Sequence, residues 1–228
     1  NHYRMLIGGR RIDRPFGDQH KELVVLHNSP LNEYLNRRGV RYRTGIKATV
    51  HHQGSRLDPA RDVLLVSGPT APRHDTNRGR ILRHFLHTGG RIVLLETGRA
   101  DDLFPDDGIR KYIPRNVEQA NIEQAGHPLY KGLRHGDLKW WNSEWSGPKV
   151  ALGTYELEWN APNLVPLAED IRTHAYGWEG PKTYPCFLYR AGKGEALVCE
   201  LRASAWKTDP LAERLLSNLL NWALKETP

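Results

Sequence analysis

Short apolar runs alternate with amphipathic stretches in the first half of the chain, which predicts strands alternating with helices. Several runs are apolar at every position, as is typical of parallel strands covered on both faces. The predicted strands are residues 23–26, 40–50, 62–66 and 91–95, and the predicted helices are residues 31–38 and 75–88. Such alternation favours a mainly parallel sheet with right-handed crossovers.

The second half of the chain has a different order. Residues 100–148 mix charged and turn-forming residues, and we interpret them as a long irregular excursion. Two further strands are predicted at 150–159 and 164–168. A hairpin follows, with strands at 185–189 and 195–201 joined by Gly192-Lys193-Gly194. A final helix is predicted to begin at Asp209-Pro210, because Asp caps helices and Pro suits their first turn. Residues 1–22 are interpreted as a linker or the tail of a preceding domain, and residues 23–228 as one α/β domain.

Composition narrows the classes of protein that the chain can belong to. The chain has 228 residues, of which 39% are hydrophobic and 26% charged, enough for one domain with a real core. No apolar run approaches the roughly 18 residues of a membrane span, and no signal peptide is visible. The formal net charge is +7. Residues 1–115 hold 21 Lys and Arg against 12 Asp and Glu, and the remainder holds 12 against 14. The basic half could bind an anionic polymer, or it could be a solvated surface.

The two cysteines fall on the strands of the predicted hairpin. A turn centred on Gly192-Lys193 places Cys186 opposite Cys199 and Leu188 opposite Leu197. Two buried thiols are the simplest interpretation, and a cross-strand disulfide or a redox role is the alternative. Two cysteines exclude a four-thiolate zinc site, and the eleven histidines lack metal-ligand spacing. We therefore predict no metal and no cofactor.

Ligands of open α/β sheets bind at the carboxyl ends of the strands, which makes the residues after two strands candidate ligand-binding positions. These are Ser67, Gly68, Glu96, Thr97 and Gly98. Glu96 is the candidate for catalysis, as a general base, if burial raises its pKa. Glu144 or Asp137 could pair with it to form a two-carboxylate glycosidase site. Hydrogen bonding to loop backbone is the alternative role.

Tryptophan is frequent in and after the excursion. Trp140, Trp141 and Trp145 are candidate ligand-binding residues, because indole rings stack on sugar rings and also anchor protein interfaces. Packing in the core, an interface between domains and contact with a glycan all remain open for them. Nothing resembling a nucleic-acid-binding motif is present, so nucleic acid is not expected as a partner.

Four segments, taken in their order along the chain, resemble segments of the class I glutamine amidotransferase-like superfamily. The resemblance covers residues 22–225. The segments are Ser67-Gly68-Pro69 after a strand, Thr88-Gly89-Gly90-Arg91 before the next, the segment 127–133 (HPLYKGL), and the Gly-Lys-Gly hairpin followed by Asn218-Leu219-Leu220. The resemblance implies a three-layer, flavodoxin-like (amidotransferase-like) sandwich whose mainly parallel sheet ends in an antiparallel hairpin.

Two catalytic parts of that superfamily are missing from this chain. Catalytic members carry a Cys at the turn after the fourth strand, where this chain has Glu96. They also carry a His after the late hairpin strand, where this chain reads Glu200-Leu201-Arg202-Ala203-Ser204. Cysteine-dependent amide hydrolysis is therefore not expected.

The resemblance is greatest to non-catalytic domains appended to β-galactosidases and other large glycoside hydrolases. It implies an accessory or oligomerisation domain, whose partners are a catalytic domain of the same polypeptide or further copies of the chain. The alternatives are a degenerate-site hydrolase acting on sugars or amides with Glu96 central, and a module that binds an anionic polysaccharide or nucleic acid. The cellular compartment is left open, since two cysteines fit either redox setting.

Overall fold

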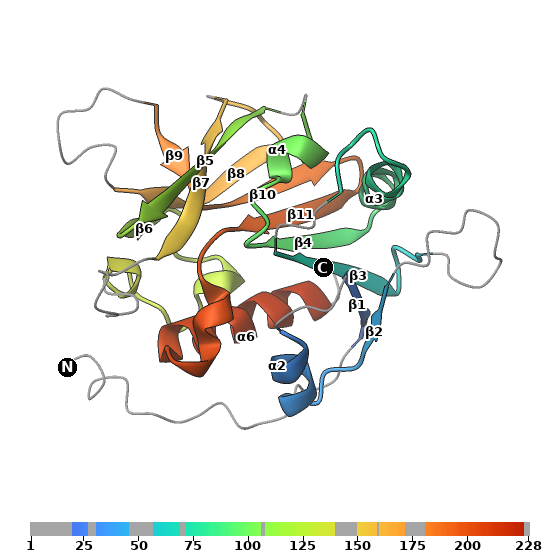
Figure 1. The fold of residues 1–228 in the computed structure, drawn as a ribbon, viewed down its shortest axis with the longest axis horizontal. Helices are drawn as coiled ribbons and strands as arrows, with labels where there is room; N and C mark the ends of the chain where they lie inside the picture. Colours follow the sequence, from blue (N-terminus) through green and yellow to red (C-terminus); the bar gives the residue numbers. More distant parts are fainter. Residues whose placement is uncertain are drawn as a thin grey trace.

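The structure is a computed structural model that describes residues 20–26, 31–45, 57–68, 72–105, 108–139, 150–158, 160–171 and 181–225. In this part of the chain, eight strands form one sheet in the order β2-β1-β3-β4-β11-β10-β8-β6 (Figure 1). Three more form a separate antiparallel sheet in the order β5-β7-β9. The strands of the large sheet are β1 (Glu22–Leu26), β2 (Tyr42–Thr44), β3 (Asp62–Ser67), β4 (Arg91–Leu95), β6 (Ala120–Ile122), β8 (Leu164–Asp170), β10 (Cys186–Ala191) and β11 (Gly194–Cys199). Those of the small sheet are β5 (Ile109–Val117), β7 (Ala151–Leu157) and β9 (Thr183–Tyr184).

The large sheet is parallel from β2 to β11 and antiparallel beyond it. Helices α2 (Asn32–Arg37) and α6 (Pro210–Leu224) pack with Leu23 and Val25 on one face. Helix α3 (Asn77–His87) and the small sheet pack with Val24 and Leu26 on the other face. Because neighbouring residues of a strand point to opposite faces, burial of the four apolar β1 side chains, residues 23–26, requires cover on both sides. This mixed α/β architecture agrees with the expected class.

Helix α6 begins at Asp209-Pro210, as the sequence predicts, and helix α3 is capped by Thr76 at its start. The Thr76 hydroxyl accepts a hydrogen bond from the Gly79 N–H at the start of α3, and Gly89, with φ +110°, follows its end. At α6, the Asp209 carboxylate accepts from the N–H groups of Leu211 and Ala212. None of the helices in the described ranges is both long and apolar enough to cross a membrane.

The predicted hairpin is confirmed down to its register, since Cys186 lies opposite Cys199 and Leu188 opposite Leu197. Both cysteines are buried with free thiols. The hairpin turn packs against the end of α3, where the Lys193 N–H donates to the His87 carbonyl. Arg91 joins the same end of the sheet to α6: its guanidinium donates to the Trp222, Ala223 and Lys225 carbonyls and pairs with Glu195.

The prediction of an irregular excursion at 100–148 is wrong for much of that range. It contains helix α4 (Ala100–Leu103), the nine-residue strand β5, strand β6 and two 3₁₀ turns, Pro128–Tyr130 and Asp137–Lys139. Strand β5 alternates irregularly between buried and exposed positions and contains Pro114, so its sequence lacks the usual strand pattern. The strand expected over 40–50 is limited to β2 within the described residues.

Candidate functional site

Three neighbouring parallel strands end at the same level, and this places the candidate residues together. Ser67 of β3 and Cys199 of β11 both lie in register with Leu95 of β4. The residues that follow, Gly68, Glu96 and Glu200, therefore lie at the carboxyl edge of the sheet. Two backbone hydrogen bonds join the strand ends: the Gly68 N–H donates to Leu95 at 3.1 Å and the Glu96 N–H to Cys199 at 2.8 Å.

The backbone turns sharply as it leaves β4. Glu96 has φ +53°, a left-handed conformation that costs a non-glycine residue about 1 kcal/mol. Gly98 has φ +58°, and α4 begins two residues later. A strained strand-to-helix turn exposes the nucleophile in some enzymes that are built on α/β sheets. The shape of such a turn is thus present here, with a glutamate at its tip.

The Glu96 carboxylate is held by Ser204. One carboxylate oxygen accepts from the Ser204 N–H and the other from the Ser204 hydroxyl, both at 2.7 Å. Burial raises the pKa of Glu96, while the two hydrogen bonds and the nearby Arg202 charge act in the opposite direction. Ser204 lies in the 3₁₀ turn Ala203–Lys207 that follows β11. The residue at the tip of the turn after β4 and a residue of the 3₁₀ turn after β11 therefore bond each other.

A second carboxyl group, Glu200, lies beneath the same turn. Its Oε1 accepts from the Gly98 N–H and the Tyr155 hydroxyl, both at 2.9 Å, and only 2% of the residue is exposed. Burial raises the pKa of Glu200 to about 7, and the negative charge of Glu96 adds to this rise. The hydrogen bonds from the Gly98 and Thr97 N–H groups and from Tyr155 act in the opposite direction. Glu200 is therefore a carboxyl group that changes its charge near neutral pH.

The small sheet covers the turn. The Tyr155 hydroxyl of β7 donates to Glu200 and accepts from the Ala100 N–H at 3.2 Å, which ties β11, β7 and α4 together. The Tyr112 ring of β5 lies so close to the turn that a Cβ on Gly98 would come within 2.9 Å of it. Burial, with the charges of Glu200 and Asp101, raises the pKa of Tyr112 to about 12. The two tyrosines shield Glu200 from water.

The structure brings together all five described edge candidates: Ser67, Gly68, Glu96, Thr97 and Gly98. The Thr97 hydroxyl oxygen is buried without a hydrogen-bond partner in the described part of the chain. The carboxyl group beside Glu96 is Glu200, which the sequence analysis named only as part of the stretch lacking a histidine. Asp137, expected as a possible partner of Glu96, accepts instead from the Arg134 N–H in its own turn at 2.8 Å. Trp140, Trp141, Trp145 and Glu144 lie outside the described residues.

The segment 127–133 that carries part of the family resemblance has a structural role. Its turn packs on α6, where the Asn218 side-chain amide donates to the Leu129 and Lys131 carbonyls, both at 2.9 Å. Leu129 and Tyr130 are buried in the core on the α6 side of the sheet. The His127 ring nitrogen accepts from the Leu129 N–H, and burial lowers the pKa of His127. This segment therefore anchors a connection to α6.

The role of the Glu96–Ser204 pair can be separated from the charge of Glu96. We expect Glu96→Ala to lower the free energy of unfolding by about 1 to 2 kcal/mol, because both hydrogen bonds are lost. We expect Glu96→Gln to cost less than half as much, because the amide oxygen can accept from the Ser204 N–H and the amide nitrogen can donate to its hydroxyl. Urea unfolding at pH 7 measures both. Equal losses would show that the charge, rather than the pair of hydrogen bonds, stabilises the turn.

No protein-family profile and no curated protein sequence matches this chain. The chain is similar in structure to a ThuA-like protein from Bacteroides uniformis, with a TM-score of 0.56, 12% identity, and coverage of 95% of this chain and 94% of that one. It is also similar to the cytoplasmic protein STM1381 from Salmonella typhimurium, with a TM-score of 0.52, 11% identity, and coverage of 90% and 100%. The exo-β-1,4-mannosidase Op5Man5 from an Opitutaceae bacterium matches with a TM-score of 0.46 and 12% identity over 90% of this chain and 36% of its own. At these identities, the first two similarities support a shared fold.

Proposed function

We propose that this chain is a non-catalytic accessory domain of a larger carbohydrate-active enzyme. The observation that supports the proposal is the bonding of Glu96 to Ser204. Catalytic members of the superfamily that the sequence resembles carry a reactive thiol at the position of Glu96. Here that position holds a carboxylate, and each of its two oxygens accepts a hydrogen bond from Ser204. Glu200 is enclosed by backbone N–H groups and a tyrosine, so it holds the turn in place rather than facing a substrate. The two carboxyl groups have structural roles.

The carbohydrate part of the proposal rests on the sequence resemblance to domains appended to β-galactosidases. We also propose that the fold is the three-layer, flavodoxin-like sandwich that this resemblance implies. Among the described residues, the one large hydrophobic side chain classed as exposed is Leu152, at 46%. Contacts of the described surface with a catalytic domain, or with another copy of the chain, would therefore be mainly polar.

A turnover assay with the purified chain tests this proposal. We expect no release of ammonia from glutamine and no hydrolysis of chromogenic β-galactosides or β-mannosides above the buffer rate. Glu96→Gln should give the same rates as the parent chain. Turnover that Glu96→Gln abolishes would overturn the proposal, provided that the control Glu158→Gln, which alters an exposed carboxylate remote in sequence from the edge, retains it.

One observation favours a second candidate function. Glu96 and Glu200 are two carboxyl groups of raised pKa at the edge where open α/β sheets bind ligands. The hydroxyl of Thr97, the residue after Glu96, is buried with no hydrogen-bond partner among the described residues. An acid–base hydrolase would use the protonated Glu200 as acid and Glu96 as base, once Ser204 had released it. If the chain is a hydrolase of this kind, Ser204→Ala should raise its turnover. If it is an accessory domain, neither the parent chain nor Ser204→Ala should show turnover.

A further inference from the structure

The β10–β11 hairpin holds the two cysteines of the chain directly opposite each other, at the end of the hairpin remote from its turn. The Glu200 N–H donates to the Pro185 carbonyl at 2.8 Å, so these two residues form a hydrogen-bonded pair. Hydrogen-bonded and non-hydrogen-bonded pairs alternate along an antiparallel ladder, so Cys186 and Cys199 form a non-hydrogen-bonded pair. In agreement, the Cys199 carbonyl points away from β10 and accepts from the Glu96 N–H at 2.8 Å.

In a pair of this kind, a cross-strand disulfide can form with little movement of the backbone. The Cα atoms of a non-hydrogen-bonded pair lie about 4.5 Å apart, within the roughly 4.4 to 6.8 Å that disulfides span. Both cysteine side chains lie in the core cluster on the α6 side of the sheet. The hydrogen bond with Cys186, together with burial, raises the pKa of the Cys199 thiol, while the Leu201 N–H acts in the opposite direction. The two sulfur atoms are therefore already neighbours.

The folded chain shields both thiols from reagents. Cys186 and Cys199 are each 0% exposed. They lie on interior strands of the large sheet, because β11 also pairs with β4 and β10 also pairs with β8. A thiol reacts as its thiolate, so the raised pKa of Cys199 slows its reaction further. We therefore expect the pair to react only when the hairpin is not packed in the sheet.

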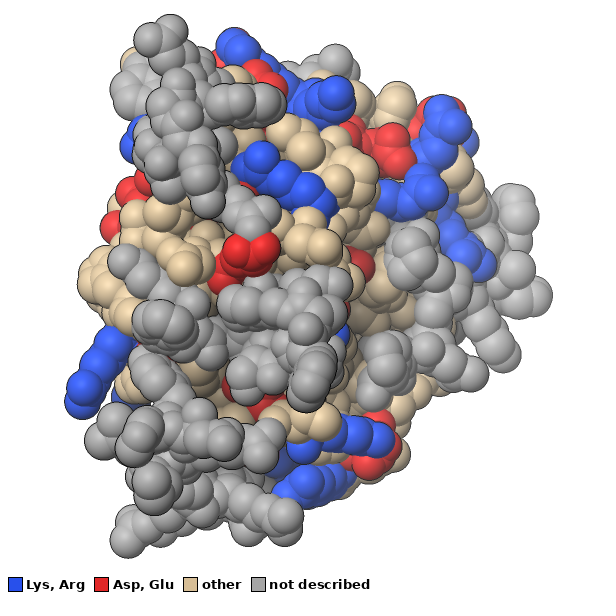
Figure 2. All heavy atoms as spheres, turned by 60° about the vertical axis from the view of Figure 1, so that its left-hand side comes forward, with Lys and Arg blue, Asp and Glu red and all other residues tan. Residues whose placement is uncertain are grey.

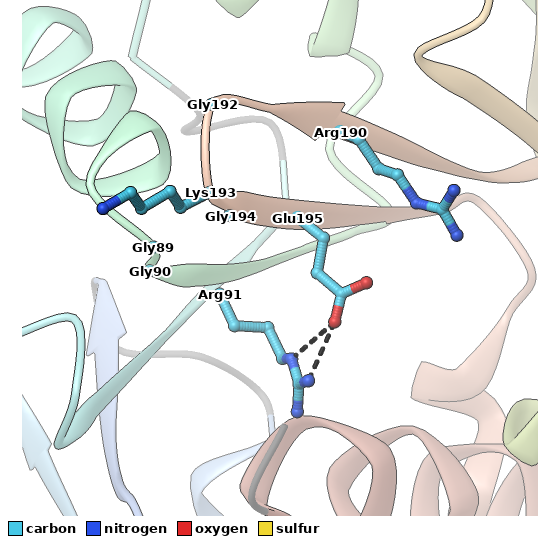
Figure 3. A pocket seen from close by; sticks show the side chains of 8 residues that line it. All are labelled: Gly89, Gly90, Arg91, Arg190, Gly192, Lys193, Gly194 and Glu195. Carbon is cyan, nitrogen blue, oxygen red and sulfur yellow. Dashed lines mark hydrogen bonds and ion pairs between the residues drawn. The ribbon is translucent and has the colours of Figure 1, made fainter. Parts of the chain in front are cut away.

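The described surface does not bring a reagent to the thiols. On the face shown in Figure 2, the coloured Lys and Arg side chains are interspersed with Asp and Glu, so that face has no field of a single sign to attract a charged oxidant. A cleft of about 200 Å³ lies at the hairpin turn (Figure 3), lined by four glycines together with Arg91, Arg190, Lys193 and Glu195. Ala191, next to this turn, is about 17 Å from Cys186 along β10. The cleft is therefore at the wrong end of the hairpin to admit a reagent to the cysteines.

We propose that Cys186 and Cys199 are a covalent modification site whose state is set while the chain folds. The pair forms a disulfide when a low-molecular-weight disulfide is present during folding, and the folded chain then preserves whichever state was formed.

The reaction is a thiol–disulfide exchange in two steps. The thiolate of one cysteine attacks a sulfur of the oxidant and displaces one small thiolate, which leaves a mixed disulfide on the chain. The thiolate of the other cysteine then attacks the protein sulfur of this mixed disulfide and displaces the second small thiolate. The two cysteines lose two electrons and two protons, and the oxidant takes them up as two small thiols.

The bond would join β10 to β11 one residue before Glu200, at the carboxyl edge of the sheet. The same sequence would then give two folded forms, according to the redox conditions of the compartment in which it folds. Oxidising compartments would yield the bonded form and reducing compartments the form with two thiols.

Refolding under two redox conditions tests the proposal. The chain is unfolded in urea with a reductant and is then refolded by dilution, either into a buffer with excess oxidised glutathione or into reductant. After alkylation in urea, we expect the first product to carry no alkyl group and to lack two hydrogen atoms in its intact mass. The second product should carry two alkyl groups.

The persistence of each state is measured by moving each folded product into the opposite buffer. We expect conversion to be at least about a hundredfold slower than in urea, because only about one molecule in a thousand or fewer is unfolded at a time. Cys199→Ala is the matched control, since its single thiol can form only a mixed disulfide with glutathione. Chain produced in the bacterial cytoplasm and chain exported to the periplasm extend the comparison without refolding, and we expect thiols in the first and the bond in the second.

Two free thiols, two mixed disulfides or a bond between chains after oxidising refolding would overturn the proposal. Oxidation of the folded chain as fast as that of the unfolded chain would also overturn it, because the pair would then be open to reagents in the folded state.

Discussion

Glu200 is expected to lower the free energy of unfolding of the parent chain by about 2 to 3 kcal/mol as the pH rises from 5 to 8, and Glu200→Gln is expected to abolish this decrease. The pKa of Glu200 is raised to about 7 in the folded chain, whereas an unfolded glutamate ionises near pH 4.3. Below that pH both states are protonated, and the group has no effect. As pH rises from there to 7, only the unfolded state gives up its proton, so stability falls until the folded pKa is passed.

Urea unfolding of the parent chain and of Glu200→Gln at pH 5 and pH 8 measures this effect. The difference in stability between the two proteins should change by about 2 to 3 kcal/mol in favour of the variant as pH rises. The amide can replace the protonated carboxyl group, because its oxygen accepts from the Gly98 N–H and the Tyr155 hydroxyl. Glu158→Gln, at an exposed carboxylate, should show no such change. A constant difference for Glu200→Gln would mean that Glu200 is ionised throughout and that its burial is not as described.

The chain with Gly194→Ala is expected to be less stable by about 3 kcal/mol, at the upper end of the cost of overpacking. A Cβ at this position would lie 2.1 Å from the Leu86 carbonyl oxygen and 2.3 Å from that of Gly90. Both are backbone atoms, so no side-chain rotation can relieve the clash. The hairpin turn would have to move away from the end of α3, which would also change the cleft beside Lys193.

Thermal and urea unfolding measure the loss, with Gly126→Ala as the matched control. A Cβ on Gly126 has no atom within 4 Å, and its backbone does not require glycine, so that variant should lie within about 0.5 kcal/mol of the parent. Equal stability of the two variants would show that the turn is not packed against α3.

The part of the fold that was predictable from sequence depends on local patterns. The register of the β10–β11 hairpin was predictable, because one glycine turn sets it for both strands, although the observed strand bounds differ from the predicted ones by one or two residues. Strand β4 was predictable because four apolar residues follow Arg91 and because Gly89-Gly90 end the preceding helical pattern. Strand β5 was not, because it lies in the small sheet, is half exposed and contains a proline, so neither its pattern nor its composition marks it as a strand.

The candidate site was predictable in place but not in its contacts. That Glu96 lies at the carboxyl edge follows from its position after β4. Its bond to Ser204 joins residues 108 positions apart, through the turn after β11. The bond between Tyr155 and Glu200 joins residues 45 positions apart, through a strand of the small sheet. No spacing in the sequence encodes contacts of this kind. The one sequence signal for these contacts was that residues 200–204 follow β11, the neighbour of β4, and therefore lie at the carboxyl edge of the sheet together with Glu96.

The size of the native protein tests most directly whether this chain is an accessory domain. The coding sequence around the 228 residues, together with the intact mass of the protein purified from its source, gives that size. We predict a polypeptide several hundred residues longer that carries a carbohydrate-active catalytic domain. A native protein with a mass near 26.1 kDa, that of these residues alone, would contradict the account, because the chain would then have to act by itself.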